Sequence, residues 1–157
     1  MADKEGLNAY IKAKEEGHEV YVETCPQYLE FTCDVYKRED GRNFVCSPPM
    51  KGEESRKALW TALKSGFIDT VATDHCPFQS YEKDWGKDDF SKIPNGCAGV
   101  ENLYPYMLDA ANRGEISYEK AVEVCAANPA RIKTPETAKH SFLYLRNGLT
   151  FVSFLTP

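Results

Sequence analysis

The chain has 157 residues, and 19 lysine and arginine residues against 24 aspartate and glutamate residues give it a formal net charge of −5. At this length we expect a folded domain with a core of its own. Net acidity argues against nucleic acid as a partner, because phosphate binding requires a basic face. The sequence has no apolar run of membrane-spanning length, and its polar first residues do not resemble a secretory signal. We therefore expect a cytoplasmic protein that does not contact membranes.

The sequence contains six cysteines, and the two that lie closest together, Cys25 and Cys33, are eight residues apart. An even count permits disulfides, but without an export signal we expect reduced thiols, mostly packed as small apolar side chains. The wide spacing also disfavours a structural zinc site, whose ligands usually come in close pairs.

The first predicted helix covers residues 3–16, where Leu7, Tyr10 and Ile11 share one face and Gly17 provides a C-terminal stop. A β-branched and aromatic run over residues 19–23 then predicts a strand.

A short apolar run over residues 43–46 predicts a second strand, which is stopped by Ser47-Pro48-Pro49. The next helix is expected over residues 53–65, followed by a strand with its core at residues 70–73. Residues 76–99 are polar and are expected to form a long loop, of the kind that often binds ligands or covers a site.

Two further helices are predicted, one over residues 100–112 and one that begins with Ser117 as its N-cap. Asn128 is expected to cap a last helix that has Pro129 at its first position. Helices that alternate with short apolar strands predict an α/β fold with parallel strands.

Asp74 is the strongest candidate for chemistry, because it follows an apolar strand directly and precedes His75. Ligands and catalytic groups collect at the C-terminal edge of parallel strands, and a carboxylate there can bind a metal or transfer a proton. The structural alternative is that Asp74 caps the following turn and His75 is a packed histidine. A nucleophile built from His75 and Cys76 is disfavoured, since sequence neighbours need not face each other.

Ser47 and Asn95 are weaker candidates. Two prolines fix the backbone after Ser47, so its main chain could be presented to a ligand, although a rigid corner without a ligand is the commoner case. Asn95 and Gly96 favour a turn with positive φ, and local sequence does not assign Asn95 a substrate contact. The sequence has no P-loop, dinucleotide-binding or serine-hydrolase motif.

Several segments resemble, in order, the signatures of the dihydropyrimidinase and hydantoinase family of cyclic amidohydrolases. The resemblance covers residues 3 to about 132. It is carried by the blocks ETCPQYL, FVCSPP, LW, VATDHCPF, DFSKIPNG and NPARI at residues 23–29, 44–49, 59–60, 71–78, 89–96 and 128–132.

The resemblance implies that the chain is the C-terminal portion of a (β/α)8 TIM barrel. Members of the family open the ring amide of dihydropyrimidines and hydantoins to N-carbamoyl amino acids. They typically use two divalent metal ions, often zinc, bridged by a carboxylated lysine and a hydroxide. The resemblance further implies that Asp74 is a metal ligand and the proton shuttle, and that Ser47 and Asn95 hold the ring amide.

The chain also departs from the family pattern. It has no His-x-His motif, its histidines are His18, His75 and His140, and Asp74 alone matches one of the family's six metal-binding side chains. We therefore expect residues 1–133 to be an incomplete barrel that is inactive alone. Residues 134–157 form a divergent tail, in which Asn147-Gly148 between two apolar runs predicts a β-hairpin.

Three functions remain open for this chain, and they differ in whether it is an enzyme. The first is a metal-dependent hydrolase of a small cyclic amide, by descent. The second is a non-enzymatic assembly protein, because an incomplete barrel exposes strand edges that can pair with a complementary fragment or another copy. The third is a thiol redox enzyme, supported only by Cys25-Pro26 and Cys76-Pro77 and requiring a cysteine of low pKa.

Overall fold

The computed structural model describes residues 1–133, and the hairpin expected over residues 134–157 lies outside the described residues. The described part is mostly helical. Its helices and strands, in chain order, are α1 (Lys4–Glu15), β1 (Glu23–Thr24), α2 (Pro26–Glu30), α3 (Glu53–Lys64), β2 (Thr70–Val71), α4 (Ser80–Lys83), α5 (Leu103–Asn112), α6 (Tyr118–Val122) and α7 (Asn128–Lys133). The short 3-10 turns are η1 (Cys33–Lys37), η2 (Gly41–Phe44), η3 (Asp84–Gly86) and η4 (Phe90–Lys92), and η5 (Glu123–Ala127) is a π-helical turn.

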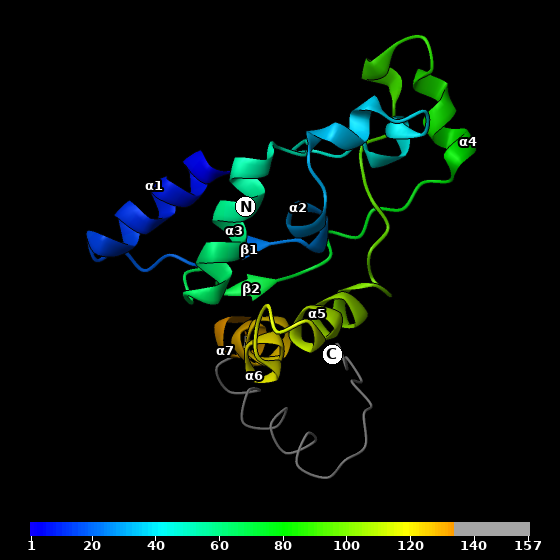
Figure 1. Ribbon diagram of the computed structural model, residues 1–157. Helices are drawn as coiled ribbons and strands as arrows, with labels where there is room; N and C mark the ends of the chain where they lie inside the picture. The colour runs from blue at the N-terminus through cyan, green and yellow to red at the C-terminus, as the bar shows by residue number, and fades with distance from the viewer. Residues whose placement is uncertain (134–157) are drawn as a thin grey trace.

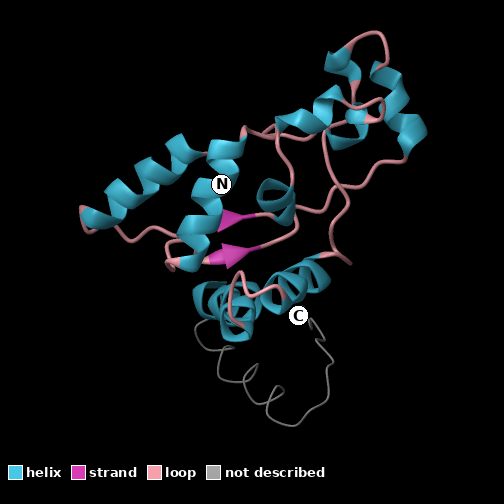
Figure 2. Ribbon diagram, viewed as in Figure 1, coloured by secondary structure: helices cyan, strands magenta, loops and turns pink. Residues whose placement is uncertain are grey.

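The two strands pair in parallel, with Glu23 opposite Thr70 and Thr24 opposite Val71. This confirms the predicted α/β arrangement with parallel strands (Figure 2). The first strand covers Glu23–Thr24 and overlaps the expected residues 19–23 only at Glu23. Main-chain pairing with the second strand begins only at Val22, whose carbonyl accepts from the amides of Asp69 and Thr70.

Helices cover the strand pair from both sides. α1 and α3 lie on one side, and α5, α6 and α7 lie on the other (Figure 1). The side chains between these layers include several that are fully or almost fully buried, namely Leu29, Leu59, Leu63, Ile68, Val71, Met107 and Val124. We call this part, from α1 to β2 and from α5 to α7 without the intervening loops, the helical core.

The helices α1 and α3 confirm the predictions for residues 3–16 and 53–65. The Asp3 carboxylate accepts from the amide of Gly6 and so caps α1. Each helix ends where a glycine adopts the left-handed region, with φ of 86° at Gly17 and 78° at Gly66. Ser117 likewise caps α6 as expected, because its hydroxyl accepts from the amide of Lys120.

The strand predicted over residues 43–46 is wrong. The chain forms the 3-10 turn η2 there, and the Val45 amide donates to the carbonyl of Arg42 rather than to a neighbouring strand. Gly41 permits this turn, since a Cβ at that position would lie 2.9 Å from the carbonyl oxygens of Val35 and Tyr36.

The prediction that Asn128 is an N-cap is also wrong. Asn128 has helical dihedral angles, and α6, η5 and α7 form one uninterrupted helical run. Its side-chain amide instead donates to the carbonyl of Asp69 at 2.8 Å, which ties this run to the start of β2.

The long loop expected over residues 76–99 contains α4, η3 and η4, and α5 begins at Leu103 rather than at residue 100. Together with residues 33–50 this segment forms an irregular region that we call the loop lobe (residues 33–50 and 76–98). It lies at the end of the molecule remote from α7 (Figure 1). Within residues 1–133, no helix combines the length and the apolar character needed to cross a membrane.

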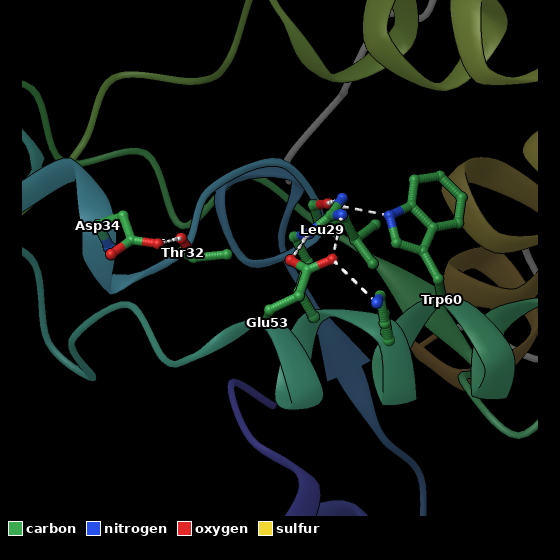
Figure 3. A network of polar contacts seen from close by, with 7 residues as sticks. Leu29, Thr32, Asp34, Glu53 and Trp60 are labelled. Atoms are coloured by element: carbon green, nitrogen blue, oxygen red, sulfur yellow. Dashed lines mark hydrogen bonds and ion pairs between the residues drawn. The ribbon is translucent and has the colours of Figure 1, made fainter.

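A polar network joins α3 to α2 next to the lobe (Figure 3). The Trp60 indole donates to the carbonyl of Leu29 at 2.9 Å, and Arg56 donates to the same oxygen at 3.4 Å. Glu53 accepts from Arg56 at 2.7 and 2.8 Å, which holds the guanidinium in place. The carbonyl of Leu29, in the last turn of the short helix α2, therefore finds two donors on α3.

Candidate active site at the carboxyl ends of the strands

Asp74 lies just beyond the carboxyl end of β2, at the edge of the parallel pair where the sequence placed it. It is exposed, and its φ of 48° puts it in the left-handed region. Aspartate is one of the few non-glycine residues found there, at a cost in backbone strain that is common at functional sites. The backbone therefore turns sharply at Asp74 and leaves its carboxylate facing solvent at the strand end.

His75 is held by main-chain contacts at the surface rather than packed in the core. Its Nδ1 accepts from the amides of Gly99 at 3.0 Å and Val100 at 3.2 Å. The side chain is exposed, so its role in the structure is to anchor the turn that precedes α5. A nitrogen that accepts two amide protons cannot at the same time bind a metal through that lone pair.

Ser47 is exposed on the rigid corner that the sequence predicted, and the Ser47–Pro48 peptide bond is cis. The Tyr28 hydroxyl donates to the carbonyl of Pro48 at 2.9 Å, and the Cys46 thiol donates to the same oxygen at 3.2 Å. Burial raises the pKa of Tyr28, so its hydroxyl keeps the proton that it donates. The corner after Ser47 is therefore fixed from α2.

Asn95 lies in an irregular segment rather than in the predicted turn, although Gly96 has the expected positive φ, at 157°. It is exposed, and its side-chain amide donates to the carbonyl of Ile93 at 3.1 Å. Glycine is needed at the next position, because a Cβ on Gly96 would lie 2.4 Å from the carbonyl oxygen of Cys76. This close approach brings the Asn95 segment against the segment that follows Asp74.

Lys83 connects the two loops that carry Ser47 and Asn95. Its ammonium donates to the carbonyls of Val45 at 2.7 Å, Pro94 at 2.6 Å and Gly96 at 2.9 Å, and the residue is only 2% exposed. Burial lowers the pKa of this lysine. Lys83 was missed by sequence reasoning, since nothing distinguishes it from other lysines of a polar loop.

Main-chain contacts complete the link between the three predicted segments. The Gly96 amide donates to the carbonyl of Val45, and the Cys76 amide donates to the carbonyl of Cys97, each at 3.0 Å. The negative charge of Asp74 is also among the causes that raise the pKa of Cys25, which burial brings to about 12. The structure thus gathers the Ser47, Asp74 and Asn95 segments at the same end of the strand pair.

The described residues do not fit the two-metal site that the family resemblance implies. Within residues 1–133, no group of three or more histidine, cysteine, aspartate or glutamate side chains is arranged to hold a metal ion. Asp74 would offer a single carboxylate, and metal binding depends on ligand number and geometry.

Two surface hollows of 430 and 410 Å³ lie elsewhere. One is lined from α2 and η1 and the other from α3 and α5, and both include Glu30 and Arg56. Ser47, Asp74 and Asn95 line neither of them.

Comparison with known proteins identifies relatives of this chain. The chain is 40% identical to the D-hydantoinase of Streptomyces coelicolor over 131 residues, which cover 82% of this chain and 28% of that protein. It is 41% identical to the D-phenylhydantoinase of Escherichia coli over 126 residues, which cover 78% of this chain and 27% of that protein. No family model matches the chain.

Solved structures agree with these sequence relatives. The dihydropyrimidinase of Brevibacillus agri NCHU1002 superposes with a TM-score of 0.80 at 35% identity, covering 83% of this chain and 29% of that one. The chain therefore spans about three tenths of the length of the relatives it matches. Sequence and structure together place it in the dihydropyrimidinase and D-hydantoinase family, as a part of a member's length.

Proposed function

We propose that this chain is the C-terminal barrel part of a cyclic amide hydrolase that opens dihydropyrimidine or hydantoin rings. The names of the relatives support this substrate class, and the chain spans 27–29% of their lengths. The observation that carries the proposal is the gathering of the Ser47, Asp74 and Asn95 segments at the carboxyl ends of β1 and β2, with Lys83 joining two of them. In a (β/α)8 barrel this edge is where active sites lie.

Ring opening adds water across the amide bond, so the carbonyl carbon gains a hydroxyl group and the ring nitrogen gains a proton. We assign the proton transfer to Asp74, because it is the exposed carboxylate at the strand end. The Ser47 main chain and the Asn95 segment would hold the ring amide, and the bonds from Tyr28 and Lys83 would keep both loops in position. Catalysis benefits when such groups are held before the substrate arrives.

By family resemblance, this function would use divalent metal ions, zinc above all. The described residues contribute one carboxylate and no cluster of further ligands. The chain alone is therefore expected to be inactive, and the remaining ligands must come from another part of a complete barrel.

Co-expression tests this function. The chain would be produced alone and together with the remainder of the Streptomyces coelicolor D-hydantoinase that lies outside the matched region. Hydantoin and dihydrouracil opening would then be measured with added zinc or manganese. We expect no turnover above the metal-only blank for the chain alone, and turnover for the co-purified pair.

Asp74→Asn should abolish turnover by the pair, and Asp88→Asn, in the exposed part of the loop lobe, serves as the matched control. A co-purified pair whose turnover survives Asp74→Asn would contradict the assigned role. A chain that turns over substrate alone would contradict the need for a complementary part.

One observation favours a second function, assembly without catalysis. In the described part of the chain β1 and β2 pair only with each other, so each strand has one edge without a strand partner. Parallel strands are normally buried within larger sheets, and unpaired edges are templates for another chain. A complementary barrel fragment or a second copy of the chain would satisfy them. Light scattering at micromolar concentration tests this function, and a stable monomer would contradict it.

A further inference from the structure

Cys46 and Cys97 are 51 residues apart in the sequence, yet their thiols meet between the Ser47 and Asn95 loops. The hydrogen bond between the Gly96 amide and the Val45 carbonyl sets the two cysteines side by side, since each directly follows one of these residues. The thiol of Cys97 hydrogen-bonds the sulfur of Cys46. Cys46 is buried, and Cys97 is partly exposed against the same apolar cluster.

The Cys46 thiol donates to the carbonyl of Pro48 at 3.2 Å, which favours its protonated form, whereas two other features around the pair favour a thiolate. The buried ammonium of Lys83, which bonds the carbonyls of Val45 and Gly96, is positive charge next to both sulfurs. The hydrogen bond from Cys97 lowers the pKa of Cys46 to about 7, and the same bond raises the pKa of Cys97. A thiolate is the reactive form of cysteine toward oxidants and disulfides.

We propose that Cys46 and Cys97 are a dithiol that closes to an intramolecular disulfide when the protein meets a peroxide. One thiol attacks hydrogen peroxide, breaks the O–O bond and becomes a sulfenic acid, with release of one water. The neighbouring thiol then attacks the sulfenic sulfur, forms the S–S bond and expels a second water. Two thiols and one hydrogen peroxide thus give one disulfide and two waters.

The remaining cysteines lack one or more of these features. Burial raises the pKa of both Cys25 and Cys125 to about 12. Cys33 and Cys76 are exposed, and neither has a neighbouring thiol bonded to it as Cys46 has. The disulfide would join covalently the two loops that Lys83 already joins by hydrogen bonds, and this inference does not depend on the proposed hydrolase function.

Peptide mapping of the full chain tests the proposal. The reduced protein would be treated with an equimolar amount of hydrogen peroxide, alkylated and digested with trypsin without reduction. Cleavage after Arg42, Lys51, Lys92 and Arg113 gives residues 43–51 with Cys46 alone and residues 93–113 with Cys97 alone. We expect these two peptides to be joined as the main cross-link, with the mass of the intact monomer lowered by about two hydrogens.

Two variants and a stability measurement keep the test decisive. Cys97→Ser should abolish the cross-link, whereas Cys33→Ser, at an exposed position, should leave it unchanged. Oxidation should also raise the Tm by several degrees, because a bond across 51 residues constrains the unfolded chain. A main cross-link between other cysteines, oxidation without a cross-link, or a lowered Tm would each overturn the proposal.

Discussion

The helical core and the loop lobe are stabilised in different ways. In the core, α3 and α5 bury Leu59, Leu63 and Met107 completely. In the lobe, large aromatic side chains stay in solvent, with Trp85 65% and Phe90 83% exposed. The core therefore depends on apolar burial, which is strong and non-directional.

The lobe depends on directional polar contacts, and Lys83 is at their centre. Three carbonyls from two separate loops share its ammonium, so those loops keep their relative position without a large apolar interior. The candidate site lies where the two regions meet, because Asp74 follows a core strand while Ser47 and Asn95 belong to the lobe. The strand end and the loops beside it are therefore held by different contacts, and we expect each to be perturbed separately.

The largest effect is expected from breaking the core. Leu63→Ala removes a fully buried side chain from α3 and leaves a cavity, so the free energy of unfolding should fall by about 2–5 kcal/mol. Leu108→Ala on α5 is the control, since Leu108 is 42% exposed and should change stability by less than about 0.5 kcal/mol. Urea unfolding followed by circular dichroism measures both. Equal losses for the two variants would contradict a core that depends on burial.

The next effect is expected in the lobe. Lys83→Met removes the shared donor and leaves the carbonyls of Val45, Pro94 and Gly96 without it, at a cost of about 1–3 kcal/mol. Hydrogen exchange should accelerate in residues 76–98 and change little in α3. The exposed Lys87, changed to Met, serves as the control. Uniform acceleration over the whole chain would show that the lobe does not open separately.

The sequence was informative where local signals decide the structure. An apolar face followed by Gly17 predicted α1, and Gly17 adopts the positive φ that ends a helix, as Gly66 does after α3. The position of Asp74 beyond a strand end also followed from a local pattern. Contacts between neighbours in sequence are enough to specify such features.

The sequence was uninformative where distant partners decide. Lys83 bonds the carbonyl of Val45, 38 residues earlier, and the side chain of Asn128 bonds the carbonyl of Asp69, 59 residues earlier. The 3-10 turn at residues 41–44 replaced a predicted strand, because no neighbouring strand pairs there. Local propensity carries no information about partners at such separations.

A third, smaller effect tests whether the core also depends on a polar contact. The Tyr10 hydroxyl donates to the buried carboxylate of Asp69 at 2.7 Å, and the same oxygen accepts from the amide of Val22 at 2.7 Å. Tyr10→Phe should lower the free energy of unfolding by about 1.5 kcal/mol, since a bond to a charged group is lost. Tyr21→Phe, which removes an exposed hydroxyl bonded to Glu19, is the control. If both variants match wild type in urea, the core is held by apolar burial alone.

The smallest effect is a pH dependence that originates in a core thiol. Burial raises the pKa of Cys125 from 9.0 to about 12, so between these values the unfolded chain loses a proton that the folded chain keeps. Stability is therefore retained below pH 9 and falls as the pH rises toward 12, by roughly 0.5–1 kcal/mol for this group between pH 8 and 9.5. Urea midpoints at these two pH values should differ less in Cys125→Ala and Cys125→Ser, neither of which titrates there, than in wild type. If the difference between the two urea midpoints is the same in both variants as in wild type, the core does not protect Cys125 from ionisation. Burial at Cys125 would then be less complete than in the layer around Leu59 and Met107.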